Sequence, residues 1–295
     1  MKTPLMMIIN PAAGKGGFRR ALPDALKMLS DAGYAVTMYF TECRGHATEL
    51  ATQYAGAVPY LLVLGGDGTL AEAIAGLMPL SERPKVGYIP IGTANDVART
   101  IGLPKNDILA GAQRFIGGSP HPFDEGQHDG GYFNYVAAFG AFTEVSYATP
   151  QEAKKQLGEA AYLLGAVKSL STLKSRRVTV EYDDGVIDGE FLYGSMSNST
   201  SVAGIVKFRK EMVCLGDGES ELVLVKDPES IEGFSEIVAS VLSQRFDSDK
   251  LLILHTKRAK FTFEKPTAWT RDGESGGEFT EVELCNHKAA VQLIF

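Results

Sequence analysis

The first part of the chain, up to about residue 120, alternates short apolar runs with amphipathic helical patterns. The apolar runs are continuous, which is typical of strands that are covered on both faces of a parallel sheet. We therefore expect a βαβα order and a mainly parallel sheet, whose ligands bind at the carboxyl ends of the strands. The predicted strands are 5–9, 35–40, 59–64 and 85–90, and the predicted helices are 18–32, 47–55, 70–77 and 107–116.

After Asp124 the pattern changes to strand-like runs at short spacing, with apolar and polar positions alternating. Asp-Gly pairs at 184–185, 188–189 and 217–218 are hairpin-turn signals, so this part predicts an antiparallel, β-rich second domain. Helical patterns at 152–173 and near 230–243 interrupt it. The predicted strands are 133–139, 178–182, 190–196, 221–225, 251–255, 260–263, 280–284 and 289–294, and we expect the last of them to pair back onto the first domain.

Composition narrows the classes of partner. The 295 residues hold 29 Lys and Arg against 36 Asp and Glu, a net charge of −7 that disfavours nucleic-acid binding. Three cysteines are too few for a disulfide framework or a four-ligand zinc site, which fits a reducing cytosol. No apolar window approaches the ~18 residues of a membrane span, so membrane contact is expected to be peripheral.

Two loops rich in Gly, Asn, Thr and Asp follow the first and third predicted strands. Loop 10–17 reads Asn-Pro-Ala-Ala-Gly-Lys-Gly-Gly, and its glycines leave N–H groups free to bind an anion where the next helix begins. A plain strand-to-helix turn also explains this loop on its own. In loop 65–69 three glycines surround Asp67, so a phosphate can approach the backbone beside a carboxylate. A turn with an Asp cap needs one glycine rather than three, and this loop therefore favours a nucleotide role.

A third loop, 91–99, reads Ile-Gly-Thr-Ala-Asn-Asp-Val-Ala-Arg and follows the fourth predicted strand. An isolated Asn-Asp pair would by default cap the next helix. Here the loop is expected at the same edge of the sheet as the other two, because all three follow parallel strands. Their convergence predicts a nucleotide-binding site in the first domain.

In this order and spacing, loops 10–14, 65–69 and 92–96 resemble the catalytic domain of bacterial soluble diacylglycerol kinases. The late sequence Asp272-Gly273-Glu274 resembles that family's acidic motif, so the resemblance extends over nearly the whole chain. It implies an α/β fold, with an N-terminal parallel-sheet domain of the NAD kinase and phosphofructokinase type and a C-terminal antiparallel β-sandwich. The nucleotide-binding domain would be 1–125, rejoined by the last strands at about 286–295, and the β-rich lipid-substrate domain would be 126–285.

The same resemblance implies ATP and Mg²⁺ as cofactors and assigns residues to them. Asp67, Asp96 and Asp124 would form a polar network near the metal, because carboxylates beside a triphosphate repel it unless a cation or shared protons intervene. Glu274 is the candidate general base, and Asp272 would help to orient the site. The ATP site would comprise Asn10, Pro11, Ala12, Ala13, Gly14, Thr41, Gly66, Asp67, Gly68, Thr69, Leu70, Ala71, Glu72 and Thr93.

The family also carries a structural Mg²⁺ at the turn that matches residues 214–219. Asp217 would ligate through its side chain, and Cys214 and Glu219 through their main-chain carbonyls. This chain has Gly216 where many members have a second Asp, so a simple hairpin turn is an equal alternative.

Together these residues predict transfer of the γ-phosphoryl group of ATP to the hydroxyl of diacylglycerol, which gives phosphatidic acid. The alternatives are another lipid alcohol (sphingosine, ceramide or a polyprenol), an NAD kinase that shares the Gly-Gly-Asp-Gly-Thr element, and a non-catalytic lipid-binding pseudokinase. The presence of Asp67, Asp96 and Glu274 argues against the pseudokinase.

The expected partner is a membrane lipid, and the expected location is the cytoplasm with peripheral membrane association. Residues 153–180 contain six basic residues and one acidic residue. They also contain apolar residues at helical spacing, so this segment is a candidate membrane contact. A core-packed helix with a solvated basic face is the alternative. The oligomeric state stays open, a homodimer included.

Overall fold

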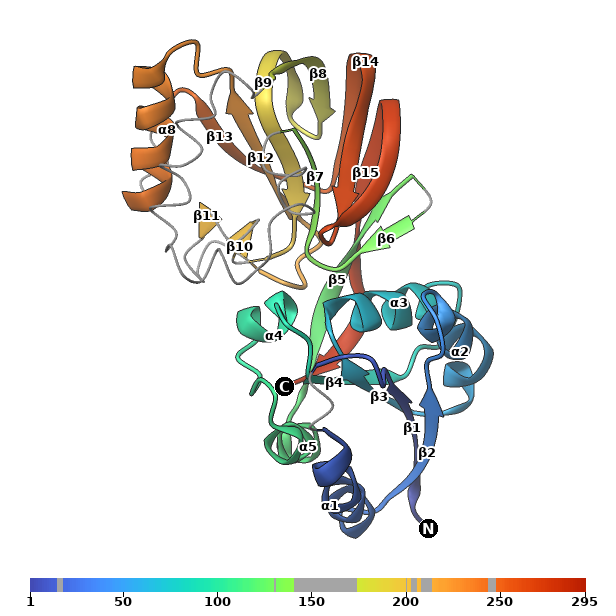
Figure 1. The fold of residues 1–295 in the computed structure, drawn as a ribbon. Helices are drawn as coiled ribbons and strands as arrows, with labels where there is room; N and C mark the ends of the chain where they lie inside the picture. Colours follow the sequence, from blue (N-terminus) through green and yellow to red (C-terminus); the bar gives the residue numbers. More distant parts are fainter. Residues whose placement is uncertain are drawn as a thin grey trace. The chain divides into compact units, whose positions relative to one another are not determined.

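The computed structural model describes residues 1–14, 18–129, 131–140, 174–199, 201–202, 206–207, 214–243 and 248–295 (Figure 1). Its contacts divide the chain into two units. Unit 1 comprises Met1–Glu125 and Lys288–Phe295, and unit 2 comprises Gly126–His287. The helix predicted at 152–173 lies outside the described residues.

Unit 1 is built on a parallel sheet in the order β4, β3, β1, β2, to which the end of β15 adds in parallel beside β4. Helices α1 and α5 cover one face, and α2 and α3 lie on the other (Figure 1). The central strands are buried almost throughout, as their continuous apolar runs predict. The elements are β1 (Thr3–Ile9), α1 (Phe18–Asp31), β2 (Tyr34–Phe40), α2 (His46–Tyr54), η1 (Ala55–Ala57), β3 (Tyr60–Gly65), α3 (Asp67–Leu77), β4 (Lys85–Pro90), α4 (Asp96–Thr100) and α5 (Ile108–Gly117).

Unit 2 is antiparallel and β-rich, as predicted. Strands β9 and β14 each pair with both β7 and β8, which closes a ring of strands around a core that contains Phe139, Phe261 and Trp269. Strands β12 and β13 extend the sheet from β9, and α8 confirms the helix expected near 230–243. The elements are β5 (Pro120–His128), β6 (Gly131–Phe133), β7 (Val136–Gly140), β8 (Arg176–Tyr182), β9 (Gly185–Ser197), β10 (Ser201–Val202), β11 (Val206–Lys207), β12 (Ser220–Lys226), α8 (Ile231–Ser243), β13 (Leu251–Thr256), β14 (Arg258–Arg271) and β15 (Glu274–Ile294). The β-sandwich layout stays a prediction.

The last strand differs from its prediction. Two strands, 280–284 and 289–294, were expected, but β15 is continuous from Glu274 to Ile294 and contributes to both units. Ala289, inside β15, has a left-handed backbone with φ of 48°. The Asp124 carboxylate accepts a hydrogen bond from its N–H at 2.6 Å, which holds this bend within the strand. The polar residues near 286–288 led to the prediction of a break between two strands. The hydrogen bond from the distant Asp124, which keeps the strand continuous, cannot be read from the side-chain pattern.

His128, at the end of β5, is a buried histidine in an apolar setting. Its ring is 1% exposed and packs 5.2 Å from Trp269 and 5.4 Å from Phe279, measured between ring centroids. Neither ring nitrogen has a side-chain or backbone partner among the described residues. Burial, helped by the charge of Arg271, lowers the pKa of His128 from 6.5 to about 4. The imidazole is therefore neutral in the folded protein at neutral pH.

The imidazole of His128 therefore binds a proton less readily in the folded protein than in the unfolded chain. The free energy of unfolding should therefore fall as the pH drops below about 6.5, with the loss complete below about 4. Between pH 7 and pH 4.5 the free energy of unfolding should fall by roughly 2–3 kcal/mol less in His128→Phe than in the wild type. Urea unfolding at the two pH values measures it. His255→Gln, which changes an exposed histidine of β13, is the control, and equal acid loss in His128→Phe and wild type would contradict the assignment.

Candidate active site

The three glycine-rich loops predicted to converge do so in unit 1. Asn10 Nδ2 donates to Thr69 Oγ1 at 3.0 Å, which joins the first loop to the second. A Cβ added to Gly14, whose φ is 68°, would lie 2.5 Å from the Ile91 carbonyl oxygen, so the first loop also touches the third. The loops therefore form one continuous surface at the carboxyl ends of β1, β3 and β4.

The second and third loops approach each other through glycine backbones. A Cβ on Gly92 would lie 2.6 Å from Gly66 Cα and 2.8 Å from Asn95 Oδ1, so only glycine fits at position 92. A Cβ on Gly66 would lie 3.4 Å from Gly92 Cα, which is close to an ordinary contact. Gly66 is also the N-cap of α3, where unpaired N–H groups and the helix dipole favour an anion.

Asp67 and Asp96 form the acidic centre of this surface. The Asp67 carboxylate accepts hydrogen bonds from the N–H groups of Asp96 at 3.1 Å and Val97 at 3.4 Å. Burial raises the pKa of Asp67 above its ordinary value, and the charge of Asp96 raises it further, while the backbone hydrogen bonds oppose the shift. Two carboxylates in such a setting favour a bound cation or a shared proton.

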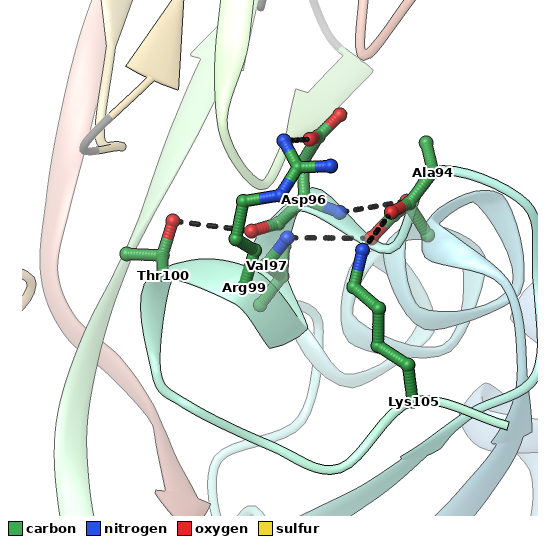
Figure 2. A network of polar contacts seen from close by, with 7 residues as sticks. Ala94, Asp96, Val97, Arg99, Thr100 and Lys105 are labelled. Carbon is green, nitrogen blue, oxygen red and sulfur yellow. Dashed lines mark hydrogen bonds and ion pairs between the residues drawn. The ribbon is translucent and has the colours of Figure 1, made fainter. Parts of the chain in front are cut away.

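Two cations border the third loop, as Figure 2 shows. Arg99 Nη1 donates to Asp96 Oδ1 at 2.7 Å across one turn of α4, and Lys105 Nζ donates to the Ala94 carbonyl at 2.5 Å. Thr100 Oγ1 donates to the Asp96 carbonyl at 3.1 Å, which fixes the short helix. The third loop therefore carries positive charge next to Asp96, which suits an anionic ligand.

Tyr88, on β4, is a residue of this site that sequence reasoning missed. Its hydroxyl lies 3.4 Å from Asn95 Oδ1, and burial together with the charges of Asp67 and Asp96 raises the pKa of the phenol. Asn95 has a left-handed backbone with φ of 53° and donates from Nδ2 to the Gly92 carbonyl at 2.8 Å. The available signal was a tyrosine in the strand that leads directly into the Gly-Thr-Ala-Asn-Asp loop.

The remaining residues predicted for ATP occupy several different positions. Thr41 is buried at the end of β2, Leu70 is fully buried, and Thr93 is exposed on the third loop. The Glu72 carboxylate accepts hydrogen bonds from the N–H groups of Gly45 at 2.8 Å and Ala47 at 3.3 Å. Glu72 thus ties the start of α2 to α3, a structural role that the motif alone did not suggest. Pro11, Ala12, Ala13, Gly68 and Ala71 lie along the first and second loops or the first turn of α3.

Asp124 is linked to the returning strand β15. It is fully buried on β5, and its observed hydrogen bond joins it to the Ala289 N–H of β15. The structure thus brings Asp67 and Asp96 together and gives Asp124 a clamp on the returning strand.

The late acidic motif forms a tight turn in unit 2, between β14 and β15. The Asp272 carboxylate accepts from the N–H groups of Asn134, Tyr135 and Val136 at 2.8, 3.0 and 3.1 Å. Asp272 also has a left-handed backbone, with φ of 47°. Glu274, two residues later, is exposed at the start of β15. Asp272 therefore organises the turn, while the Glu274 carboxylate is accessible to a substrate.

Asp272→Ala should lower the free energy of unfolding by roughly 2–4 kcal/mol, because it leaves three backbone N–H groups without their acceptor. Asp272→Asn should cost less, since asparagine tolerates a left-handed backbone and keeps one acceptor oxygen. Urea unfolding measures both. Asp184→Ala, in an exposed turn of the same unit, is the control and should change stability by about 0.5 kcal/mol or less. Equal stability of Asp272→Ala and wild type would show that the clamp is not structural.

The turn predicted to hold a structural metal is stabilised by its own carboxylate. Asp217 Oδ1 accepts from the Glu219 N–H at 2.9 Å, and Cys214 is exposed. Glu221 follows, 3% exposed, and burial with the nearby charge of Asp217 raises its pKa to about 8. Within the described ranges, no group of three or more His, Cys, Asp or Glu side chains is arranged to hold a metal ion.

Three converging glycine-rich loops on a parallel α/β unit, followed by an antiparallel unit with a late acidic turn, are the arrangement expected of a nucleotide-dependent transferase. Comparisons with known proteins agree. Residues 4–128 match the family model "Diacylglycerol kinase catalytic domain". Diacylglycerol kinases of Bacillus subtilis and Staphylococcus aureus are similar at 33% and 36% identity, over 92% and 94% of this chain and 89% and 88% of their own lengths.

Solved structures give the same result. A candidate diacylglycerol kinase from Bacillus anthracis superposes with a TM-score of 0.81 at 25% identity, covering 100% of this chain and 97% of that one. The chain belongs to the diacylglycerol kinase family.

Proposed function

We propose that this protein is an ATP-dependent diacylglycerol kinase, which transfers the γ-phosphoryl group to the free hydroxyl of diacylglycerol and releases phosphatidic acid. The single observation that carries the proposal is the contact of three glycine-rich loops around Asp67 in a chain of this family. Exposed N–H groups at the start of α3 are the donors expected for phosphate oxygens.

The residues divide the work of phosphoryl transfer between them. Gly14, Gly66 and Gly68 let the phosphates approach the backbone, and Arg99 and Lys105 supply positive charge beside the third loop. Glu274 accepts the proton of the lipid hydroxyl as the hydroxyl oxygen bonds to the γ-phosphorus, while the bond between the γ-phosphorus and the bridging oxygen of ATP breaks and ADP leaves. Asp67 holds the third loop by accepting hydrogen bonds from the N–H groups of Asp96 and Val97. In this proposal it also lies on the cation side of the nucleotide.

Mg²⁺ accompanies ATP in this proposal. The residues fit it, because two carboxylates lie together here: burial first, and then the charge of Asp96, raise the pKa of Asp67, and a divalent cation would offset both. When bound, the ion neutralises charge on the phosphates. The turn at Asp217 remains a weaker candidate for a second ion.

The lipid substrate requires the protein to reach a membrane surface. In the part of the chain that the structure describes, no helix has the length and apolar character needed to cross a bilayer. We propose peripheral contact with the cytoplasmic membrane face. The basic segment expected to mediate it is 153–180, of which 153–173 lie outside the described residues.

A panel of acceptors tests the proposal. The protein is incubated with ATP, Mg²⁺ and, separately, diacylglycerol, sphingosine, ceramide, a polyprenol or NAD, and phosphorylated products are identified by mass spectrometry. The proposal expects phosphatidic acid as the main product. Preferential phosphorylation of any other acceptor would replace diacylglycerol as the substrate, and ATP binding without transfer to any acceptor would support a non-catalytic role.

A further inference from the structure

The third loop of the site contains a residue in a strained backbone conformation. Asn95 has φ of 53° and ψ of 55°, in the left-handed region, and the residue is 0% exposed. Asparagine tolerates this region better than most residues with a side chain, but the conformation still costs free energy. Such strain persists where several contacts hold it, often at functional sites. The contacts around Asn95 therefore indicate what the loop positions.

Tyr88 holds Asn95 from the interior of unit 1. Ile89 belongs to the core that the sheet forms with α1 and α5, so Tyr88, the preceding residue of β4, points to the opposite face. Tyr88 is buried, and its hydroxyl donates to Asn95 Oδ1 at 3.4 Å. Asn95 Nδ2 in turn donates to the Gly92 carbonyl at 2.8 Å. The phenol thus fixes the side chain whose amide closes the turn from Gly92 to Asn95.

Lys105 and Asn106 hold the same loop from its other side. Lys105 Nζ donates to the Ala94 carbonyl at 2.5 Å, as Figure 2 shows, and the Asn106 N–H donates to the Pro90 carbonyl at 2.8 Å, just before the loop. The Ala94 carbonyl and the Asn95 N–H belong to one planar trans peptide, in which they point in opposite directions. A contact that fixes the carbonyl therefore also fixes the direction of the Asn95 N–H.

This N–H and the next two point at the Asp67 carboxylate. The N–H groups of Asp96 and Val97 donate to it at 3.1 and 3.4 Å, and the Asn95 N–H is a third backbone donor. Consecutive N–H groups converge on an anion in this way when a left-handed residue takes part in the turn. The orientation of the Asp67 carboxylate therefore depends on the conformation of Asn95.

We propose that Tyr88 and Lys105 are positioning residues for phosphoryl transfer. They hold the peptide between Ala94 and Asn95 from two sides, and this peptide orients the Asp67 carboxylate toward the nucleotide. The inference rests on the proposed function, because Asp67 is the acid beside the nucleotide in that reaction. It gives Lys105 a second role beside the positive charge that it supplies.

Tyr88→Phe removes the hydroxyl and keeps the buried ring. The kcat for diacylglycerol should fall roughly tenfold or more, because a small displacement of a group in the site can cost up to about 10²-fold. The KM for ATP should rise, while the KM for diacylglycerol should stay at the wild-type value. Assays are run well below the melting temperature of each variant, so that a loss of stability alone does not change kcat. Tyr60→Phe, on the neighbouring strand β3 and outside the three loops, is the control and should keep wild-type values.

A double-variant cycle tests whether the two residues act through the same peptide. Lys105→Met should also lower kcat and raise the KM for ATP. Tyr88→Phe should then cost clearly less in the Lys105→Met background than in the wild type, because the loop has already lost one of its two supports. Lys105 is exposed, so its variant provides a folded protein even if Tyr88→Phe does not fold.

Wild-type kcat and KM for ATP in folded Tyr88→Phe or in Lys105→Met would overturn the inference. Losses that simply multiply in the double variant would also overturn it, because they would show that the two residues act independently. These results leave the kinase activity in place. Failure of the wild type to phosphorylate diacylglycerol would instead overturn the proposed function and the inference with it.

Discussion

Replacing Glu274 with glutamine should lower kcat on a saturating lipid by roughly 10²–10⁴-fold, the range ascribed to general base catalysis. Glutamine preserves the shape of the side chain but cannot accept the proton of the lipid hydroxyl. Glu274 is exposed at the start of β15, whereas Asp272 beside it is engaged by three backbone N–H groups. The fold and the affinity for ATP should therefore be unchanged in this variant.

The measurement is steady-state phosphorylation of diacylglycerol, with ATP affinity determined separately by calorimetry. Glu278→Gln is the matched control, because Glu278 is an exposed glutamate of the same strand. It should retain wild-type kcat. If Glu274→Gln keeps near wild-type kcat while Asp67→Asn is inactive with ATP binding intact, the base is Asp67 and the assignment made here is wrong.

Asp67→Asn should lower turnover by roughly 10²–10³-fold, the size of effect seen when one electrostatic contact to the reacting group is lost. Unlike Glu274→Gln, it should also weaken Mg²⁺-dependent ATP binding, because the proposed site places the cation beside this carboxylate. Stability should not fall, since burial and Asp96 already disfavour the charged form of Asp67. The amide oxygen of asparagine can still accept from the Asp96 N–H.

Calorimetric titration with ATP at several Mg²⁺ concentrations checks the second effect. Asp107→Asn provides the control, because Asp107 also caps a helix of unit 1, accepting from the Ala110 N–H at 3.0 Å, but lies outside the three loops. Its ATP affinity should equal that of the wild type. A normal Mg²⁺ dependence in Asp67→Asn would remove Asp67 from the metal side of the site.

The sequence predicted the features that follow from local pattern. Strands β1, β3 and β4 were found because a buried parallel strand requires an uninterrupted apolar run. Strand β2 was also predicted, although none of its residues is buried. The convergence of the loops was predicted because parallel strands end at one edge, and the Asn10–Thr69 hydrogen bond confirms it.

Features that depend on distant partners were not predicted. The clamp from Asp124 to Ala289 joins residues 165 positions apart, and the clamp from Asp272 to Asn134 joins residues 138 apart. Neither of these hydrogen bonds produces a periodic pattern in the sequence. From the sequence alone, an Asp that accepts hydrogen bonds from backbone N–H groups cannot be distinguished from an Asp that binds a substrate. Glu72 illustrates the difficulty, since it lies inside a nucleotide motif and yet ties α2 to α3.

The most direct test of the account is transfer of labelled phosphate from γ-labelled ATP to diacylglycerol in mixed micelles with Mg²⁺, for the wild type and for Glu274→Gln. The account predicts labelled phosphatidic acid from the wild type and roughly 10²–10⁴-fold less from the variant. Absence of labelled phosphatidic acid from a folded wild-type protein that binds ATP would contradict it.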